Sequence, residues 1–385
     1  MRIALLIPDN REVWKRYAEP APIFGQAPAA LLSGFMAMPE LEVHVLSCVR
    51  QPVAAPTKLA DNVWFHALHV PRLGWIRTGY QGCIRAMRSK LREIKPDLVH
   101  GQGTELESGI CAAFSSYPNV ITLLGVMREM KEVLNARPGS FYWMASLMES
   151  LALQRTSGVV ANSNFTEACV RHRTPQTWLV PNALRQEFLN TPIAASSKRT
   201  RNVVLNIGTI VEYKRQNELI DVAEKLRVNG VDVRLQFVGA ATPGTAYVDR
   251  FLERIRNKDW VTWHKSLSTS EVIAALDQAG ALVHVSGIES FGLVVAEALA
   301  RNVKFIGFGV AGVNDIVKEV EGAEVFGDGD WAGITSAIAG WARAGHPRPT
   351  QAAATMRERY APMVVARKHL DIYRQVLQNQ RAQSL

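Results

Sequence analysis

The sequence predicts an α/β protein made of two doubly wound parallel-sheet domains. Short apolar segments alternate with amphipathic segments along the chain, as is typical of parallel strands joined by helices on both faces of a sheet. The 385 residues exceed what one hydrophobic core usually accommodates. The alternation pauses once, in the polar and small-residue stretch 190–201, and then resumes. We therefore expect two similar domains that face a central cleft.

The apolar segments place the strands in chain order. Those predicted in the first half are Ile3–Ile7, Val43–Leu46, Leu98–His100 and Val120–Leu124. Those predicted in the second half are Val203–Ile207, Arg234–Val238 and Leu282–Val285. The first domain is expected over residues 1–188 and the second over 202–358, with a linker at 189–201. Ligands of such sheets bind beyond the carboxyl ends of the strands.

Composition narrows the class of protein. With 48% hydrophobic and 21% charged residues, the chain is expected to be soluble and globular. No apolar run approaches the ~20 residues of a membrane-spanning helix, and the first strand pattern carries no signal-peptide region. The four cysteines lack metal-ligand spacing, as expected of free thiols in a reducing compartment. We therefore expect a cytoplasmic location.

The formal net charge of +9 predicts an anionic partner, for which nucleotide sugars, acidic lipids and nucleic acid all qualify. The chain shows no helix-turn-helix, zinc-finger or RNA-binding signature, so nucleic acid is not expected. A dinucleotide-dependent oxidoreductase would need a glycine fingerprint after the first strand. Pro8-Asp9-Asn10-Arg11 stands there instead.

The most informative stretch contains Glu289 and Glu297. The apolar run 281–285 predicts a buried strand, a polar turn follows at 286–290, and a helical segment extends through Ala300. A strand-to-helix turn presents free backbone N–H groups and the positive end of a helix dipole, which favour a phosphate. Gly292 lets a ligand approach the backbone closely.

We expect Glu289 at the mouth of that helix and Glu297 two turns inside it, on nearly the same face and roughly 12 Å apart. That is about the span from the sugar to the ribose of a nucleotide sugar, with the pyrophosphate between them. Carboxylates accept strong hydrogen bonds from such hydroxyls. A solvated stripe of two glutamates is the alternative, although the flanking residues here are apolar.

A second strand-to-helix turn is predicted over residues 206–217. Its strand ends at Gly208, and Lys214 and Arg215 stand at the entrance of the next helix, within reach of a pyrophosphate. A surface basic pair is the alternative. Two more glycine-containing turns, at Gly239 and at 307–315, are expected at the same edge of the sheet.

Taken in this order, the segments resemble the retaining glycosyltransferases of family 4, whose two-domain fold is called GT-B. The resemblance runs nearly the full length, and the twin-glutamate segment is its most specific part. The matching segments are Phe24–Pro28, Pro96–His100, Ala161–Ser163, Val180–Ala183, Gly208–Lys214, Gly239, Glu289–Glu297 and Gly309–Gly312. Residues 359–385 resemble the final helix, which in this fold crosses back onto the first domain.

The resemblance implies a hexosyltransferase. It would move a sugar from a UDP- or GDP-linked donor to a hydroxyl of a glycan or lipid-linked glycan, as in polysaccharide biosynthesis, with retention at the anomeric carbon. Glu297 would hold the ribose, Glu289 the donor sugar, and Lys214 would neutralise the leaving diphosphate. The other donor-binding positions implied are Gly25, Gln26, Gly208, Thr209, Arg215, Gly239, Ser290, Phe291, Gly292 and Leu293.

The resemblance implies no metal or other cofactor, because basic side chains and helix ends would do its work. Asp328-Gly329-Asp330 spells the metal-binding motif of a different glycosyltransferase fold. At this place, after the last predicted strands, we expect a solvent-exposed turn.

Two positions depart from the family pattern. Thr209 stands where many members carry arginine, so Arg215 is expected to substitute in part. Leu124 stands where members often carry histidine, and its backbone carbonyl is expected to face the anomeric carbon. His100, at a neighbouring strand end, is a stand-in for that histidine unless it is structural. The departures leave a second hypothesis, a GT-B protein that binds nucleotide sugar or glycan without transfer.

A basic amphipathic helix is predicted over residues 84–95. Its cationic stripe, next to an aromatic residue, Trp75, that we expect to be exposed, would suit peripheral contact with an anionic membrane on its inner face. An ordinary helix packed by its apolar side is the alternative. The stripe consists of Arg85, Arg88, Arg92 and Lys95.

Overall fold

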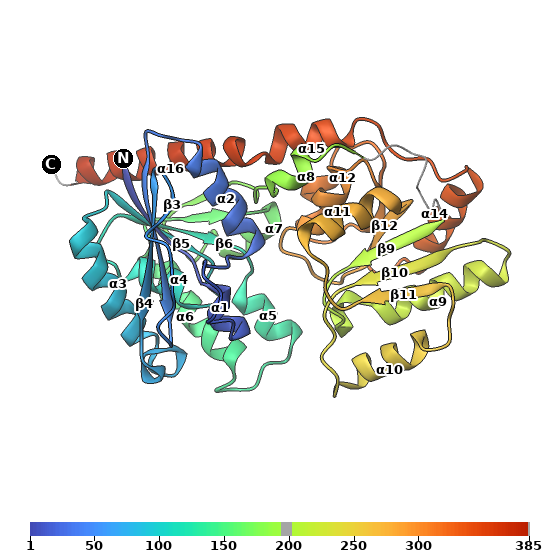
Figure 1. Cartoon of the computed structure of the whole chain (residues 1–385), viewed down its shortest axis with the longest axis horizontal. Coiled ribbons are helices and arrows are strands. Elements are labelled where there is room, and N and C mark those ends of the chain that lie inside the picture. Colours follow the sequence, from blue (N-terminus) through green and yellow to red (C-terminus); the bar gives the residue numbers. More distant parts are fainter. Residues whose placement is uncertain (194–201, 384–385) are drawn as a thin grey trace. The chain divides into compact units, whose positions relative to one another are not determined.

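The computed structural model describes residues 1–193 and 202–383. The chain forms two compact units, shown with their elements labelled in Figure 1. Unit 1 comprises Met1–Arg185 and Tyr360–Leu385, and unit 2 comprises Gln186–Arg359. Each is an α/β unit built on one sheet, as predicted.

The sheet of unit 1 has eight strands in the order β3-β4-β2-β1-β5-β6-β7-β8. All neighbours pair in parallel except β3 and β4, which are antiparallel. The four strands predicted in this half are confirmed. The strands are β1 (Arg2–Leu6), β2 (Glu42–Val49), β3 (Lys58–Ala60), β4 (Val63–His69), β5 (Leu98–Gln102), β6 (Asn119–Leu123), β7 (Val159–Ala161) and β8 (Thr177–Leu179).

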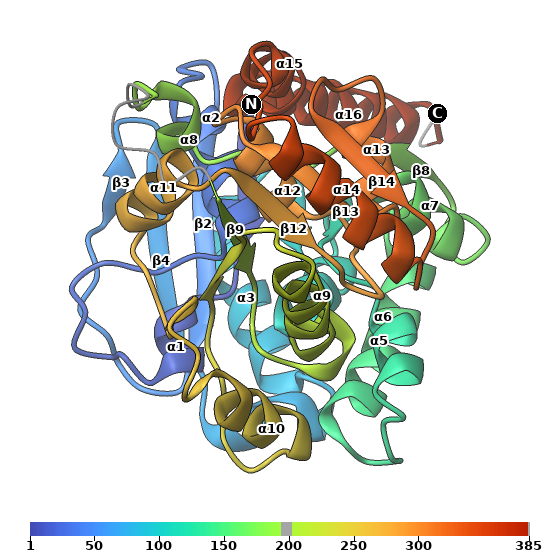
Figure 2. The same ribbon diagram turned by 90° about the vertical axis from the view of Figure 1, so that its right-hand side faces the viewer.

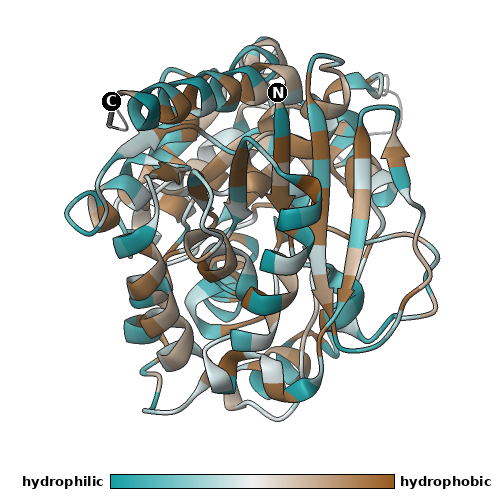
Figure 3. Ribbon diagram, turned by 90° about the vertical axis from the view of Figure 1, so that its left-hand side faces the viewer, coloured by the Kyte–Doolittle hydropathy of each residue, from teal (hydrophilic) through white to brown (hydrophobic). Residues whose placement is uncertain are grey.

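Helices cover both faces of this sheet. They are α1 (Asn10–Trp14), α2 (Gln26–Met36), α3 (Gln81–Ile94), α4 (Glu107–Ala113), α5 (Met127–Val133), α6 (Phe141–Arg155), α7 (Asn164–Val170) and α16 (Pro362–Gln383), with short 3-10 helices η1 (Arg72–Gly74) and η2 (Ile76–Thr78). Ile3 and Leu5 of β1 pack in the core beside α2 and α16. Ala4 and Leu6 pack in the opposite core, beside α3 and α4. Both side-chain sets of the strand are buried, so its sequence is continuously apolar. In Figure 3, hydrophobic residues concentrate along the strands.

The long final helix α16 packs against α2 within unit 1. A Cβ atom at Gly34 of α2 would lie 2.4 Å from the carbonyl oxygen of Pro362, so the two backbones approach closely there. His369 and Tyr373 of α16 are buried. The final helix therefore completes the core of the first unit, as the family resemblance implied.

The sheet of unit 2 has six parallel strands in the order β11-β10-β9-β12-β13-β14. The strands predicted at 203–207 and 234–238 are confirmed, and the third spans 281–284. The strands are β9 (Val203–Ile207), β10 (Arg234–Val238), β11 (Val261–His264), β12 (Ala281–His284), β13 (Lys304–Phe308) and β14 (Ala323–Phe326).

Helices also flank this second sheet, and Figure 2 views them from the side of unit 2. Helices α9 and α14 contact each other and the sheet, and α11 and α12 contact its central strands. The helices are α8 (Gln186–Asn190), α9 (Gln216–Val228), α10 (Ala246–Ile255), α11 (Thr269–Gln278), α12 (Leu293–Leu299), α13 (Val313–Val317), α14 (Trp331–Arg343) and α15 (Ala352–Tyr360), with the 3-10 helix η4 (Glu212–Lys214).

The passage from unit 1 to unit 2 differs from the expected linker at 189–201. Unit 2 already begins at Gln186, and α8 occupies the start of the predicted linker. Residues 194–201 lie outside the described part of the chain. The polar composition of this stretch could not show that its first residues fold as part of unit 2.

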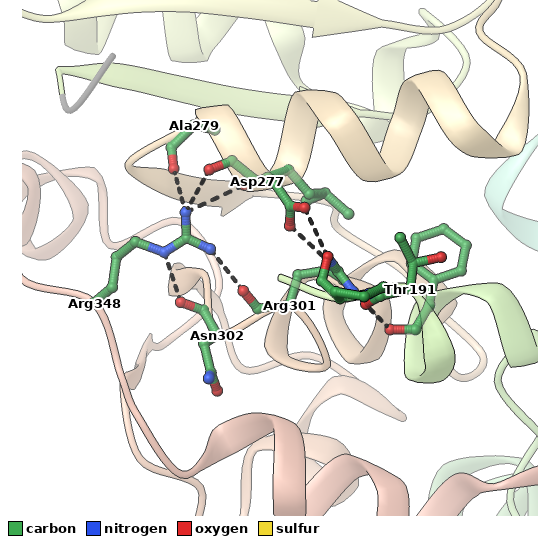
Figure 4. A network of polar contacts seen from close by, with 9 residues as sticks. Thr191, Asp277, Ala279, Arg301, Asn302 and Arg348 are labelled. Atoms are coloured by element: carbon green, nitrogen blue, oxygen red, sulfur yellow. Dashed lines mark hydrogen bonds and ion pairs between the residues drawn. The ribbon is translucent and has the colours of Figure 1, made fainter. Parts of the chain in front are cut away.

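Figure 4 shows the polar contacts that attach the segment around Thr191 to the rest of unit 2. The buried guanidinium of Arg301 donates to both carboxylate oxygens of Asp277, at 2.8 and 2.6 Å, and to the Pro192 carbonyl at 3.0 Å. It also donates to the carbonyls of Phe188 and Thr191. A buried charge needs this degree of pairing. Beside it, Arg348 donates to main-chain carbonyls of Leu276, Asp277, Ala279, Arg301 and Asn302.

Candidate functional site

Three side chains meet at the carboxyl edge of the unit 2 sheet. Lys214 lies in η4 after β9, and Glu289 lies in the loop after β12. The Lys214 Nζ atom is 2.5 Å from Oε2 of Glu289, and Nε2 of His284, the last residue of β12, is 3.2 Å from the same oxygen. The structure therefore brings together two of the predicted site residues and adds a histidine.

The backbone fixes this meeting point. The Gly287 N–H donates to the Tyr213 carbonyl at 2.8 Å, which ties the loop after β12 to η4 and so places Lys214 beside the glutamate. The Gly312 N–H donates to the Glu289 carbonyl at 3.1 Å. A Cβ atom at Gly312 would lie only 2.2 Å from the Ser290 carbonyl oxygen. The glycine-rich turn after β13 thus packs directly against the Glu289 loop.

Charge keeps Glu289 ionised. Burial alone would raise its pKa, but the positive charge of Lys214 and the hydrogen bond from His284 outweigh burial and lower the pKa to about 2. Burial lowers the pKa of His284, because it outweighs the attraction of Glu289. Since an ionised carboxylate can only accept hydrogen bonds, the neutral His284 ring presents its Nε2–H to Glu289.

One oxygen of Glu289 remains available. Within residues 1–193 and 202–383, both side-chain hydrogen bonds of Glu289 fall on Oε2. The side chains of Glu289 and Lys214 are 20% and 16% exposed. Oε1 can therefore accept a hydrogen bond from a ligand hydroxyl while Oε2 stays bound to its cation.

The predicted relation between Glu289 and Glu297 is wrong in its geometry. Helix α12 begins only at Leu293, and Gly292 before it adopts a left-handed conformation with φ 99°. Glu289 therefore lies in the loop ahead of the helix, because a right-handed helix cannot run through that glycine. The distance of roughly 12 Å, which assumed helical rise over all eight residues, does not apply. Glu297 lies inside α12 and is 3% exposed.

The other predicted donor-binding residues of unit 2 lie in the same set of loops. Ser290 and Leu293 are half-buried, whereas Phe291 is buried. Thr209 is exposed, and its carbonyl accepts a hydrogen bond from Gln216 at 3.0 Å. A Cβ atom at Gly239 would lie 2.0 Å from the Gly208 carbonyl oxygen, so the loops after β9 and β10 cross in direct contact, which only glycine permits.

Arg215 has a partner that the sequence did not suggest. It caps α9 in a left-handed conformation, and its guanidinium pairs with Asp328. Asp330 caps α14 by accepting from the Gly333 N–H at 2.8 Å. The predicted turn at 328–330 is confirmed, and its first acid offsets the charge of Arg215. That Arg215 substitutes for the missing arginine stays a prediction.

Besides His100, three predicted site residues belong to unit 1. Gly25 precedes α2 as its cap, and Gln26 is the exposed first residue of that helix. Leu124 follows β6, and its carbonyl accepts a hydrogen bond from Nδ2 of Asn162 at 3.3 Å. Their contact with the donor stays a prediction.

The prediction that His100 stands in for a ligand-binding histidine is wrong. Its side chain has no exposed surface. Nδ1 lies 2.6 Å from the Tyr373 hydroxyl and Nε2 lies 2.7 Å from Oγ1 of Thr122. Burial and the neighbouring His369 hold the pKa of His100 well below its usual value. His100 therefore joins β5 to α16, a role set by a residue 273 positions away.

Two ionisable residues at strand ends were missed. His284 closes the apolar run that predicted β12, and a polar residue at the carboxyl end of a parallel strand is the signal that would have found it. Glu105 follows β5, and burial together with Glu149 raises its pKa to about 7. A carboxyl group that titrates near neutral pH is suited to proton transfer.

The predicted basic helix is confirmed as α3. The four residues of the predicted stripe, Arg85, Arg88 and Arg92 in α3 and Lys95 at its C-cap, are exposed, and the apolar side of α3 is buried in the core of unit 1. Trp75, expected to be exposed, is only 5% exposed, because its indole N–H donates to the Val70 carbonyl and Arg50 covers the ring. None of the helices in the described part of the chain has the length and apolarity needed to cross a bilayer.

Comparison with known proteins places these loops in context. Residues 191–357 match the family described as Glycosyl transferases group 1. No curated protein sequence matches the chain. Among solved structures, sucrose-phosphate synthase from Thermosynechococcus elongatus is similar, with a TM-score of 0.73 and 16% identity, over 98% of this chain and 100% of that chain.

Two other solved structures are similar over nearly their full lengths. Alr3699/HepE of Anabaena in complex with UDP-glucose has a TM-score of 0.69 and 15% identity, covering 99% of this chain and 100% of that chain. The lipopolysaccharide outer core galactosyltransferase WaaB has a TM-score of 0.64 and 13% identity, covering 100% of both chains. At such identities the likeness establishes the fold. The chain thus has the GT-B fold, and its residues 191–357, which contain the Lys214–Glu289 pair, carry the sequence pattern of group 1 glycosyl transferases.

Proposed function

We propose that this protein is a retaining hexosyltransferase of family 4 that acts without a metal ion. It transfers a sugar from a UDP- or GDP-linked donor to a hydroxyl of a glycan or lipid-linked glycan. The observation that carries the proposal is the cluster of Lys214, His284 and Glu289 inside the segment that matches group 1 glycosyl transferases.

The cluster supplies what a nucleotide-sugar donor requires. Oε1 of Glu289 accepts a hydrogen bond from a sugar hydroxyl, because Lys214 and His284 keep the carboxylate ionised and hold its other oxygen. Lys214, whose ammonium lies beside the same carboxylate, would neutralise the diphosphate of that ligand. A Cβ atom at Gly208 would meet no atom closer than 3.9 Å, so a ligand can approach the backbone there. Glu297 of α12 binds the ribose hydroxyls.

In the reaction, the bond between the anomeric carbon and the diphosphate oxygen breaks, and the acceptor oxygen bonds to that carbon on the same face. The acceptor proton passes to an oxygen of the leaving phosphate. Negative charge grows on the diphosphate during this step, and Lys214 stabilises it in a site partly shielded from water. No protein nucleophile takes part, which is what retention by same-face displacement requires.

The solved structures support the choice of donor. Alr3699/HepE was crystallised with UDP-glucose and with UDP and glucose. TarM was crystallised with UDP and a GlcNAc-glycerol. A UDP-linked sugar is therefore the first donor to test. Metal independence is tested by adding a chelator to the transfer assay: full activity supports it, and loss of activity that a divalent cation restores contradicts it.

We further propose that the protein acts in the cytoplasm and that α3 makes peripheral contact with an anionic membrane. Arg85, Arg88, Arg92 and Lys95 are exposed along one helix, which supports the contact. The burial of Trp75 removes the aromatic anchor from that surface. Sedimentation with anionic liposomes tests it. Binding that survives charge reversal of Arg85, Arg88 and Arg92 would contradict it.

A second function is favoured by two departures from the family pattern, Leu124 and Thr209. In this alternative the protein binds a nucleotide sugar or glycan without transferring it. Donor hydrolysis in the absence of an acceptor separates the two hypotheses, because a binding protein should release no free sugar.

The deciding experiment is a thermal-shift panel of UDP, GDP, ADP and their common sugars, run with the wild type, Glu297→Ala and Glu289→Gln. Stabilisation by one nucleotide sugar that both variants lose, together with transfer that both lose, would support the proposal. Full transfer by Glu297→Ala with a demonstrated donor would contradict it. Glu253→Gln, at an exposed position of α10, is the matched control.

A further inference from the structure

A cavity in unit 1 is lined mainly by cationic and polar side chains that the proposed donor site does not use. Its volume is about 450 Å³, which is within the usual range of small-molecule sites. Four cations line it, together with two aromatic residues. These are Lys15, Arg50, Arg72, Arg77, Tyr17 and Trp75.

The fold gathers these residues from three neighbouring strands. Lys15 and Tyr17 come from the segment after β1, Arg50 directly follows β2, and residues 72–77 follow β4. These strands are adjacent in the order β4-β2-β1 and run parallel, so the segments after them meet at the carboxyl edge of the sheet. Ligands of parallel sheets bind at that edge.

The charge of the cavity is strongly positive. Glu12 is the carboxylate that contacts its cations: it is 2.8 Å from Nη1 of Arg50 and 3.2 Å from Nζ of Lys15. It also accepts from the Tyr17 hydroxyl at 2.9 Å. The four lining cations and Glu12 together carry a formal charge of +3. Glu12 positions its partners but does not neutralise the cavity.

Two of the cations are available to a ligand. Arg72 and Arg77 are exposed, and within residues 1–193 and 202–383 neither forms an ion pair. Arg50, by contrast, is held in place, because its guanidinium lies 4.3 Å from the centroid of the Trp75 ring and pairs with Glu12. The site therefore combines a pre-positioned guanidinium with two unpaired ones, and guanidinium groups bind oxyanions in a bidentate manner.

We propose that this cavity binds a phosphate group, and that the phosphate belongs to the acceptor of the transfer reaction. The second clause rests on the proposed function, whereas the first does not. A ligand with a single carboxylate would leave most of the local positive charge unbalanced. A phosphate monoester balances more of it, because it carries close to two negative charges on three oxygens. The phosphate comes either from a soluble phosphorylated sugar or from a lipid phosphate. Leu73, 85% exposed at the rim, offers an apolar contact to the latter.

Calorimetric titration with inorganic pyrophosphate tests the site. The variant Arg72→Ser/Arg77→Ser removes two exposed cations that form no ion pair within the described part of the chain. The control Arg137→Ser/Arg367→Ser removes the same charge from two other exposed positions of the same unit, away from the cavity lining and from α3. We expect the cavity variant to bind pyrophosphate at least about tenfold more weakly, and the control to bind as the wild type does.

Equal weakening in both variants would overturn the proposal, because it would show that net charge alone attracts the anion. Absence of pyrophosphate binding by the wild type would overturn it as well. Titration with UDP separates this test from that of the donor site. If UDP does not bind but pyrophosphate binding still depends on Arg72 and Arg77, the donor proposal fails and the phosphate site stands. If UDP binds but pyrophosphate binding does not depend on Arg72 and Arg77, the phosphate site is overturned and the donor proposal stands.

Two further ligands identify the source of the phosphate. One is glucose 1-phosphate, and the other is phosphatidylcholine vesicles doped with phosphatidic acid. Vesicle binding that the Arg72→Ser/Arg77→Ser protein loses and the Arg137→Ser/Arg367→Ser control keeps assigns the site to a lipid phosphate. Binding of the sugar phosphate with the same dependence, and no vesicle binding, assigns it to a soluble acceptor. If neither ligand's binding depends on Arg72 and Arg77, the acceptor assignment is overturned.

Discussion

The Nζ atom of Lys214 lies 2.5 Å from Oε2 of Glu289, although the two residues are 75 positions apart in the chain. The pair connects the loop after β9 with the loop after β12. Strands β9 and β12 are neighbours in the unit 2 sheet. The charge of Lys214 keeps Glu289 ionised in a partly buried place. Most of the predictions below follow from this pair.

Replacing Lys214 with methionine should remove the charge that stabilises the leaving diphosphate. We expect transfer activity to fall by about 10²–10³-fold, as for other groups that stabilise developing charge, and UDP to bind more weakly. Steady-state kinetics and calorimetry with UDP measure the two effects. Lys225→Met, at an exposed position of α9, is the matched control. Unchanged activity in Lys214→Met would contradict the assigned role.

The same substitution should change the pH dependence of donor binding. In the wild type, Lys214 and His284 outweigh burial and hold the pKa of Glu289 at about 2, so its carboxylate is ionised throughout the neutral and mildly acidic range. Without Lys214, burial gains weight and this pKa rises. Donor affinity measured between about pH 4 and 8 should then fall at the acidic end in the variant only. Parallel profiles for both proteins would contradict the prediction.

The free energy of unfolding should depend on pH through the same carboxylate. A lowered pKa in the folded state means that Glu289 stabilises the fold above its ordinary pKa of 4.5, and that this contribution is lost as the pH falls toward 2. Urea denaturation of the wild type and of Lys214→Met, compared at neutral and acidic pH, measures it. The variant should lose less stability on acidification than the wild type does.

Glu107 of α4 should have the opposite effect on the pH dependence of stability. It is 1% exposed, its Oε2 has no hydrogen-bond partner among the residues that the structure describes, and burial raises its pKa from 4.5 to about 7. Between these pH values the folded protein retains a proton that the unfolded chain releases, so the free energy of unfolding falls as the pH rises.

Glu107→Gln should therefore be more stable than the wild type at about pH 8, by on the order of 1–3 kcal/mol, with a smaller difference at about pH 4. Urea denaturation at both pH values measures this. Glu253→Gln, on the exposed side of α10, is the control for the substitution itself. A Glu107→Gln protein that is equally destabilised at both pH values would contradict the prediction.

Tyr373→Phe should weaken the attachment of α16 to unit 1. The hydroxyl of Tyr373 lies 2.6 Å from Nδ1 of the buried His100, and its removal leaves that nitrogen only the long contact with Nε2 of Gln102, at 3.4 Å. We expect a loss of about 1–3 kcal/mol in the free energy of unfolding. Chemical denaturation measures the loss, and Tyr142→Phe, at an exposed position of α6, is the control. Equal stability of the two variants would show that His100 finds another partner.

Local sequence patterns predicted most of the secondary structure on which the site depends. The strands at 203–207 and 234–238 have the expected limits, and α9 begins one residue before the expected Asn217. Such segments are recognisable because apolar residues and turn residues lie within a few positions of one another. The prediction that the helix begins at Glu289 was wrong for an equally local reason. The left-handed conformation of Gly292 interrupts it, and a glycine in a sequence does not reveal its φ angle.

The sequence by itself determined the fold class, the strand order along the chain and the residue types that gather at strand ends, because these depend on periodicity and turn chemistry. Only the tertiary structure decided which of those residues meet. It paired Lys214 and His284 with one oxygen of Glu289, directed Arg215 to Asp328, and buried His100 under α16. These outcomes depend on the crossovers that bring distant loops to one edge of a sheet, and so on contacts that no local pattern encodes.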